Sequence, residues 1–245
     1  MEEDKKPFLE HLEELRQRLI RCLIAVGVAF VICYIFSKEI FALLTIPLRE
    51  ALPEGSSMIF TNLPEAFFTY LKLSFFSGIF LAFPYILYQA WLFVAPGLYA
   101  HEKRYLLPFL IFATFFFVAG AAFGYFVVFP YGFRFFLGFS TDFIRPAPKV
   151  KEYLSFSLTL LLAFGVVFEL PVFIFFLSRM GVVDHRMLAR NRRYAILIIF
   201  IAAAIFTPPD VITQLMMAAP LLVLYELSVW VAKVFGRKRP VEDEG

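Results

Sequence analysis

The sequence predicts an all-α membrane protein with six transmembrane helices, of which the fifth and sixth are short, and with both termini in the cytoplasm. Three observations support this prediction. Hydrophobic residues make up 61% of the 245-residue chain, whereas soluble proteins contain about 45–50%. Long apolar runs recur along the chain, and the lysines and arginines between them are unevenly distributed.

Six apolar runs are candidate membrane spans. Each approaches or exceeds the ~17–25 residues that a spanning helix needs, and the fifth run is the shortest. Helices are expected because lipid offers no partner to an unpaired backbone amide, and the alternating segments of a barrel are absent. The runs lie at about 19–36, 73–93, 105–133, 153–178, 194–206 and 211–232.

The basic residues orient these spans. Sixteen of the 23 lysines and arginines lie on the side of the termini, in the amino-terminal segment, the second and fourth connections and the tail. The positive-inside rule therefore predicts that both termini are cytoplasmic. We expect one membrane domain over 1–236, beginning with an amphipathic helix at about 8–18, and a disordered cytoplasmic tail at 237–245.

The outer connections differ in length. The first, at 37–72, reads as a long loop, whereas the third spans little more than 207–210 and contains two adjacent prolines, which force an abrupt turn. From Tyr194 to Pro209 is 16 residues, or ~24 Å of helix. A hydrocarbon core is ~30 Å thick, so either the bilayer is thinned here or the bundle is tilted.

The sequence lacks the signatures of an enzyme. It contains no P-loop, no HExxH, no GxSxG and no Cys/His spacing suited to a metal. We therefore expect no catalysis, no metal and no cofactor. Any work that the chain performs has to be driven by a gradient or by a partner.

Two cytoplasmic segments carry carboxylates. The stretch "PFLEHLEELRQRLI" places apolar residues at helical spacing and puts its acids largely on the other side, so it is either a functional surface or a simple membrane anchor. The tight loop "APGLYAHEKRYLLP" contains Glu102 among basic residues. That loop is either a binding surface or an ordinary topological connection.

Glu169 is the acid inside an otherwise apolar stretch, "AFGVVFELPVFIFF", and Pro171 two residues later kinks the helix. An acid within the membrane indicates a hydrated cavity, or else a protonated side chain that bonds a neighbouring helix. A proton relay in a small-solute transporter would also use such a group. Glu226 is nearer to the end of its helix and reads as reaching the interface.

The stretch "TPPDVITQ" begins the last span. Asp210 is expected to cap the following helix by accepting backbone amides. Gln214, one turn further on, is a candidate for a hydrogen bond between helices.

Together these pieces resemble the TatC family, the core membrane receptor of the twin-arginine protein translocation system. The resemblance covers nearly the whole chain in order. It rests on "HLEELRQRL" at 11–19, "PYILYQAWLFVAPGLYAHEKR" at 84–104, "AFGVVFELPV" at 163–172 and "TPPDVITQ" at 207–214.

The resemblance implies a concave bundle in the bacterial inner membrane. Its partners would be twin-arginine signal peptides of folded cargo, single-span TatA- and TatB-type proteins, and other copies of itself, with no nucleic acid. Transport would be driven by the proton-motive force without a cofactor. The alternative that the residues alone leave open is a proton-coupled solute transporter that uses Glu169.

The resemblance also implies roles for individual residues. Tandem arginines need carboxylates of matching fork geometry, and Glu13, adjacent to Glu14, is an open second candidate for that contact. The implied signal-peptide surface consists of Glu14, Glu102, Arg16, Phe93, Lys103 and Arg104. The other implied positions are Glu169 and Gln89 in an intramembrane groove, Pro47 and Asp210 on the outer side, and Thr207 and Gln214 at a docking site for partner helices.

Overall fold

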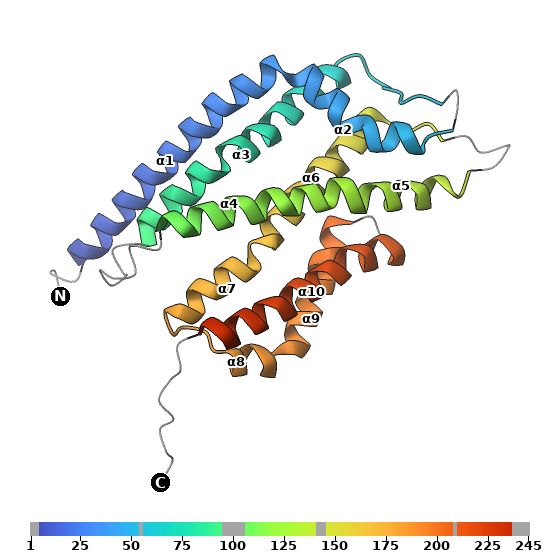
Figure 1. Ribbon diagram of the computed structural model, residues 1–245. Helices are drawn as coiled ribbons and strands as arrows, with labels where there is room; N and C mark the ends of the chain where they lie inside the picture. The colour runs from blue at the N-terminus through green and yellow to red at the C-terminus, as the bar shows by residue number, and fades with distance from the viewer. Residues whose placement is uncertain (1–4, 54–55, 95–105, 141–145, 208–209, 237–245) are drawn as a thin grey trace, which may run out of the picture. The chain divides into compact units, whose positions relative to one another are not determined.

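The computed structural model describes residues 5–53, 56–94, 106–140, 146–207 and 210–236 (Figure 1). In this part of the chain the regular elements are helices, apart from one isolated β-bridge between Ile59 and Lys149. The elements in chain order are α1 (Lys5–Ile35), α2 (Ser37–Ala51), α3 (Glu65–Val94), α4 (Leu106–Phe123), the π-helical turn η3 (Gly124–Val128), α5 (Phe129–Leu137), α6 (Val150–Phe168), α7 (Leu170–Arg179), α8 (His185–Arg190), α9 (Arg192–Phe206) and α10 (Val211–Phe235).

Five helical segments of the described residues are long and apolar enough to cross a membrane, namely Glu10–Ile35, Glu65–Phe93, Leu107–Leu137, Val150–Arg179 and Val211–Phe235. They coincide with five of the six predicted runs. The remaining run forms α9, whose 15 residues span only ~22 Å. The chain is therefore a multi-pass helical membrane protein, and its fifth predicted span is short, as expected.

Two boundaries at the start of the chain differ from the prediction. The amphipathic segment and the first span form one continuous helix, α1, of 31 residues, because no proline interrupts them. Helix α3 begins eight residues earlier than predicted, at Glu65, whose carboxylate fixes the preceding turn by accepting from the backbone N–H groups of Thr61 at 2.8 Å and Asn62 at 3.3 Å.

Helix α2 was not predicted, because the segment after the first span reads as a long loop containing Pro47. The structure instead has a 15-residue helix with buried Leu44, Thr45, Pro47 and Leu48 along one side. The signal was present in the sequence as apolar residues at helical spacing. The proline is tolerated because it lies inside a helix that packs against α3, where the rings of Phe41 and Tyr70 are 5.5 Å apart.

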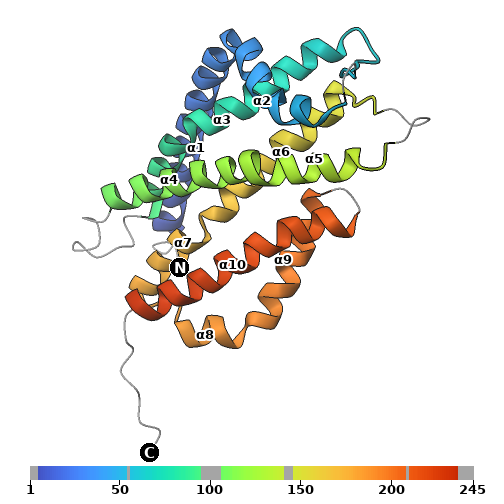
Figure 2. The ribbon, with the colours of Figure 1, turned by 45° about the vertical axis from the view of Figure 1, so that its right-hand side comes forward.

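The chain divides into two compact units, the first made of 1–114 and 146–158 and the second of 115–145 and 159–245. In the first unit α1 and α3 run side by side, as Figures 1 and 2 both show. They approach most closely at Gly78, where an added Cβ would lie 2.9 Å from the backbone nitrogen of Phe30. Such small residues permit close packing of membrane helices.

The start of α6 is tied into the first unit by three hydrogen bonds. The Tyr153 hydroxyl donates to the Leu44 carbonyl of α2 at 2.6 Å. Ile59 donates to the Pro148 carbonyl at 3.1 Å, and Val150 donates back to the Ile59 carbonyl at 2.9 Å. Segments about 90–110 residues apart in the chain are therefore held together at this end of the unit.

In the second unit the chain passes from α4 through η3 into α5 without a break. Two glycines allow the end of α4 to approach α6. A Cβ at Gly120 would lie 2.4 Å from the Phe164 carbonyl oxygen, and a Cβ at Gly165 would lie 2.7 Å from the Phe117 ring. The single turn of π-helix follows directly, and such turns often occur at functional sites.

The predicted kink before Pro171 is confirmed. Helix α6 ends at Phe168 and α7 begins at Leu170, so Glu169 stands between them with Pro171 in the first turn of α7. The ring of Pro171 removes one helical hydrogen bond, which ends the regular α6 ladder.

Helix α10 packs against α7, α8 and α9 (Figures 1 and 2). The rings of Phe175 and Phe235 meet edge to face at 5.5 Å, and the Tyr225 hydroxyl donates to the Leu188 carbonyl at 2.8 Å. Glu226 forms an ion pair with Arg192 at the start of α9, at 2.8 Å. The sequence suggested that Glu226 reaches the membrane interface, and its side chain is about half exposed. Its carboxylate also has a defined partner, Arg192.

The close approach at Gly120 yields a prediction. Gly120→Ala should lower the melting temperature of the purified protein in detergent, because overpacking against a backbone oxygen costs about 1–3 kcal/mol. Gly132→Ala is the matched control, because a Cβ there meets nothing within 4 Å and alanine favours the helix. Equal melting temperatures for the two variants would contradict the packing described here.

Candidate functional site

Several predicted site residues gather where α1 lies beside α3. The Arg18 guanidinium donates to one carboxylate oxygen of Glu14, Oε1, from Nε at 2.9 Å and also from Nη2. From Nη1 it donates to the side-chain oxygen of Gln89 on α3 at 3.4 Å. Gln89 is only 4% exposed, so the arginine joins an accessible carboxylate to a buried amide on the neighbouring helix.

The second carboxylate oxygen of Glu14 faces a different group. Oε2 lies 3.7 Å from Nδ1 of His11, which exceeds an ordinary hydrogen bond, and 32% of the Glu14 side chain is exposed. The His11 ring stacks on Phe93 at a centroid distance of 4.2 Å and an interplanar angle of 15°. An acceptor oxygen, an imidazole and a phenyl ring thus adjoin one another at the ends of two helices. This arrangement can accept a positively charged N–H donor from outside.

Glu13 and Arg16 lie on the exposed side of α1. Glu13 Oε2 is 3.5 Å from Arg16 Nη1, and the two side chains are 55% and 71% exposed. Exposed pairs of this kind contribute about 0–1 kcal/mol because water and salt screen them. The structure does not bring Arg16 into the network of Glu14. Only Glu14 of the two adjacent acids is connected to α3.

Five predictions fall on residues that the structure does not describe, and one of them is the abrupt turn at the adjacent prolines 208 and 209. Glu102, Lys103 and Arg104 belong to the undescribed segment 95–105, and the predicted tail is the undescribed segment 237–245. The described half of the predicted peptide surface therefore consists of Glu14, Arg16 and Phe93.

Glu169 is buried, with 2% exposure, and neither of its carboxylate oxygens makes a hydrogen bond of ordinary geometry to a described residue. Both sequence-based interpretations, a hydrated cavity and a protonated side chain bonded to a neighbouring helix, stay predictions, because the backbone of Phe117 on α4 interacts with this carboxylate without a hydrogen bond of ordinary geometry. Burying a carboxylate without a partner costs several kcal/mol. Gln89, which was grouped with Glu169 in the prediction, belongs to the first unit and Glu169 to the second.

The predicted residues at the start of α10 have specific contacts. Asp210 is the N-cap: it accepts from the Thr213 backbone N–H at 2.8 Å and also from the Thr213 hydroxyl. Gln214 donates from Nε2 to the Phe200 carbonyl of α9 at 3.1 Å. Both structural predictions are confirmed. Thr207, at the end of α9, is buried and donates to the Ala203 carbonyl at 2.8 Å.

Pro47 is buried within α2, among residues that pack this helix into the first unit. Leu48 beside it is 3% exposed, and one turn earlier Leu44 accepts the hydroxyl of Tyr153. Pro47 thus belongs to the packed side of a helix rather than to the loop in which the sequence suggested it lies.

Sequence reasoning missed Arg18 as a site residue, although Glu14 and Arg18 stand at the i,i+4 spacing of a helical ion pair. The local pattern gave the pair but not its contact with Gln89, which lies 71 residues away. Among the described residues no group of three or more His, Cys, Asp or Glu could hold a metal ion.

Comparisons with known proteins identify relatives over nearly the whole chain. The family model described as "Sec-independent protein translocase protein (TatC)" matches residues 10–220. A protein of that name from Desulforapulum autotrophicum is 58% identical, and the match covers 99% of this chain and 90% of the relative. The corresponding protein of Escherichia coli K12 is 41% identical, with 97% and 93% covered.

Solved structures of the same family resemble this chain. Two crystal structures described as twin-arginine translocase receptor TatC, one of them in DDM, are 41% identical to this chain. They cover 93% and 91% of it and 100% of their own chains, with TM-scores of 0.85 and 0.84.

The cap at Asp210 yields a prediction. Asp210→Ala should destabilise the protein by about 0.5–2 kcal/mol, because the first turn of α10 loses its acceptor. Asp210→Asn keeps a side-chain oxygen and should lose less. Thermal unfolding of the two variants in detergent measures the difference, and an alanine variant as stable as the asparagine variant would exclude a capping role.

Proposed function

The chain belongs to the TatC family of Sec-independent protein translocase proteins, and on this premise we propose that it is the receptor subunit of a twin-arginine translocase. In this role it binds the twin-arginine signal peptides of folded proteins. The observation that carries the proposal is the likeness to the solved twin-arginine translocase receptor over 93% of the chain, at a TM-score of 0.85. It is a component of protein transport, not an enzyme and not a solute transporter.

The chemistry of the site supports Glu14 as one of the two arginine ligands. Arg18 occupies only Oε1 of Glu14, and His11 lies 3.7 Å from Oε2, so the exposed side of Oε2 can still accept from an arginine of the peptide. A guanidinium binds a carboxylate with directed, charge-assisted hydrogen bonds. Glu102 is the proposed second ligand, which gives one carboxylate to each arginine.

Glu14 is favoured over Glu13 because it is preorganised. Arg18 fixes the Glu14 carboxylate against α3, so less side-chain entropy is lost when a peptide arginine arrives. Glu13 is held only by long, exposed contacts to Arg16 and Gln17, each at 3.5 Å. In the proposal Arg16, Lys103 and Arg104 form the flank of the surface, and Phe93 offers an apolar wall to the peptide.

We further propose six spans, with α9 as a short fifth span, both termini in the cytoplasm, and residence in the bacterial inner membrane. The charge distribution supports this orientation. At ~22 Å, α9 crosses only a locally thinned bilayer. This topology puts Pro47 and Asp210 on the outer side.

The proposed partners are single-span TatA- and TatB-type proteins, with other copies of the chain. The α9–α10 hairpin supports a docking role because apolar side chains such as Ile205 and Val211 are 72% and 69% exposed, while Gln214 joins α10 to α9 through the Phe200 carbonyl. Thr207 is the proposed second polar position of this docking site. Glu169 and Gln89 are the proposed polar positions of the membrane groove that admits the peptide. Transport is driven by the proton-motive force, without a cofactor.

The arginine contact is testable by crosslinking. A twin-arginine signal peptide carrying a photoreactive group beside the arginine pair should label the wild-type chain and label Glu14→Gln at least about 10-fold less, because a lost charge-assisted pair is worth about 1.5–3 kcal/mol. Glu13→Gln is the matched control and should label like the wild type. A twin-lysine peptide should label all three weakly.

Two results would count against this assignment. If Glu13→Gln loses as much labelling as Glu14→Gln, the preorganised carboxylate is not the ligand. If twin-lysine and twin-arginine peptides label the wild type equally, the receptor proposal itself fails.

The topology is testable with single cysteines in a background lacking Cys22 and Cys33. A membrane-impermeant maleimide should label Val211→Cys in spheroplasts, whereas Arg190→Cys should react only after lysis, because α9 separates the two positions. Both positions are exposed, so accessibility does not limit the reaction. Labelling of both from the same side would show that α9 does not cross the membrane.

A further inference from the structure

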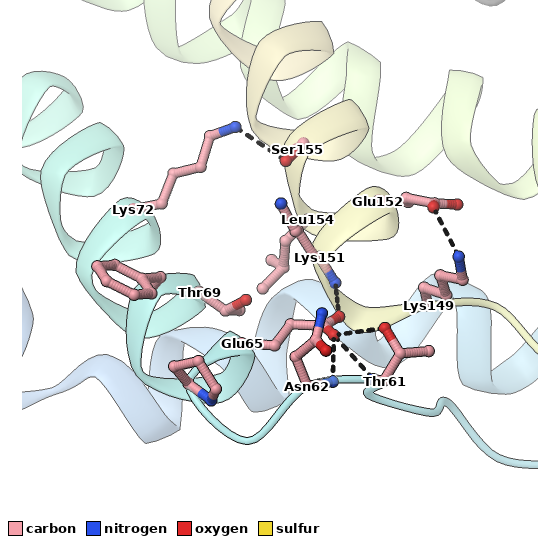
Figure 3. Close-up of a pocket in the computed structure, with 12 residues that line it drawn as sticks. Thr61, Asn62, Glu65, Thr69, Lys72, Lys149, Lys151, Glu152, Leu154 and Ser155 are labelled. Carbon is pink, nitrogen blue, oxygen red and sulfur yellow. Dashed lines mark hydrogen bonds and ion pairs between the residues drawn. The ribbon is translucent and has the colours of Figure 1, made fainter.

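The first unit contains a cavity of about 420 Å³ that the receptor function does not use. Figure 3 shows it between the turn before α3, the first two turns of α3 and the start of α6. Its polar and charged lining comes from segments far apart in the chain. These lining residues include Glu65, Thr69, Lys72, Lys149, Lys151 and Ser155.

One wall of the cavity is rigid. The buried Glu65 accepts at Oε2 from the N–H and hydroxyl of Thr61, at 2.8 and 3.1 Å, and at Oε1 from the N–H of Lys151, at 3.2 Å. The Glu65 carboxylate thus accepts hydrogen bonds from the turn before α3 and from the first turn of α6. A negative charge at the start of a helix is favourable because it complements the helix dipole. Glu65 therefore forms no ion pair with Lys72 or Lys151 among the described residues.

The lysines of the cavity are not equivalent. Lys149 pairs with Glu152 at 3.4 Å. Lys72 instead donates to the Ser155 hydroxyl at 2.8 Å, and within the described residues neither Lys72 nor Lys151 has an ion-pair partner. Figure 3 shows the side chains of Lys72 and Lys151 extending along the same space, beside Ser155. Two cations and a hydroxyl that converge on one cavity suit an anion with several acceptor oxygens.

The position of the cavity indicates which kind of anion it binds. Helices α3 and α6 both begin at its edge, and both start candidate membrane spans, Glu65–Phe93 and Val150–Arg179. The cavity therefore lies at the depth of lipid headgroups. Phe68, which also lines it, is 63% exposed, and Phe67 beside it is 54% exposed. An anion bound here has apolar surface next to it, which a lipid fills and a free ion does not.

We propose that this cavity binds the phosphate headgroup of an anionic phospholipid. The phosphate oxygens are contacted by Lys72, Lys151 and Ser155. Glu65 keeps the turn before α3 and the start of α6 together through its hydrogen bonds. Phe68 packs against the glycerol and the upper acyl chains. Basic pockets between membrane helices recognise phospholipid headgroups by this chemistry. The proposal does not rest on signal-peptide binding, so either can fail without the other.

The test is native mass spectrometry of the full chain in detergent, titrated with dioleoylphosphatidylglycerol. The first lipid should bind the wild type with a dissociation constant about 10- to 30-fold below that of K72Q/K151Q, because each lysine contributes electrostatic attraction near the bilayer surface. K38Q/R49Q is the matched control, since it removes two exposed charges from α2 of the same unit and should bind like the wild type. K72R/K151R keeps both charges and should retain binding within about threefold.

Three outcomes would overturn the proposal. One is equal lipid affinity in the wild type and K72Q/K151Q, with circular dichroism confirming that the variant is folded. Another is an equal loss in K38Q/R49Q, which would indicate attraction by net charge alone. The third is displacement of the lipid by inorganic phosphate at comparable concentration, which would assign the cavity to a free anion. Weak binding of dioleoylphosphatidylcholine to the wild type would support the anionic specificity.

Discussion

The pairing of carboxylates within an apolar chain is the constraint on which the rest of this structure depends. Each of four acids has a partner that joins separate segments or completes a helix end: Glu14 with Arg18, Glu65 with the amides of Thr61 and Lys151, Asp210 with Thr213, and Glu226 with Arg192. An unpaired acid is costly where it is buried, as Glu65 is, and there the pairing also fixes the segments that supply it. The paired acids therefore lie where neighbouring segments are joined or where a helix begins.

Two acids keep at least one carboxylate oxygen without a hydrogen bond of ordinary geometry, and both stand at positions of the proposed function. Glu14 is only partly satisfied, since Arg18 uses one of its oxygens and His11 stands 3.7 Å from the other. Glu169 makes no hydrogen bond of ordinary geometry within the described residues and lies at a break between two helices. An acceptor left open at a helix end suits a ligand that arrives from outside. An acceptor left open beside a proline break suits water or a passing peptide.

Much of the fold could be predicted from the sequence, because a helix that crosses lipid has to be a long apolar run and such runs are easy to recognise. Apolar runs predicted five of the long spans and the short α9, Pro171 predicted the break after α6, and Asp210 predicted the cap of α10. Helix α2 was missed because Pro47 resembles a loop residue, and only packing against α3 explains its place in a helix. The pairing of Glu14 with Gln89 through Arg18 and the cavity beside Glu65 could not be predicted, because both join segments 71 or more residues apart.

In the proposed function, Oε2 of Glu14 accepts an arginine of the signal peptide. A double-mutant cycle tests this contact. Peptide affinity is measured for the wild type and for Glu14→Gln. Each protein is titrated with a peptide whose arginine pair is intact and with a peptide whose second arginine is replaced by glutamine. A direct contact predicts that the two changes are non-additive, with a coupling energy of at least about 1 kcal/mol. Additive losses within about 0.3 kcal/mol would contradict the account.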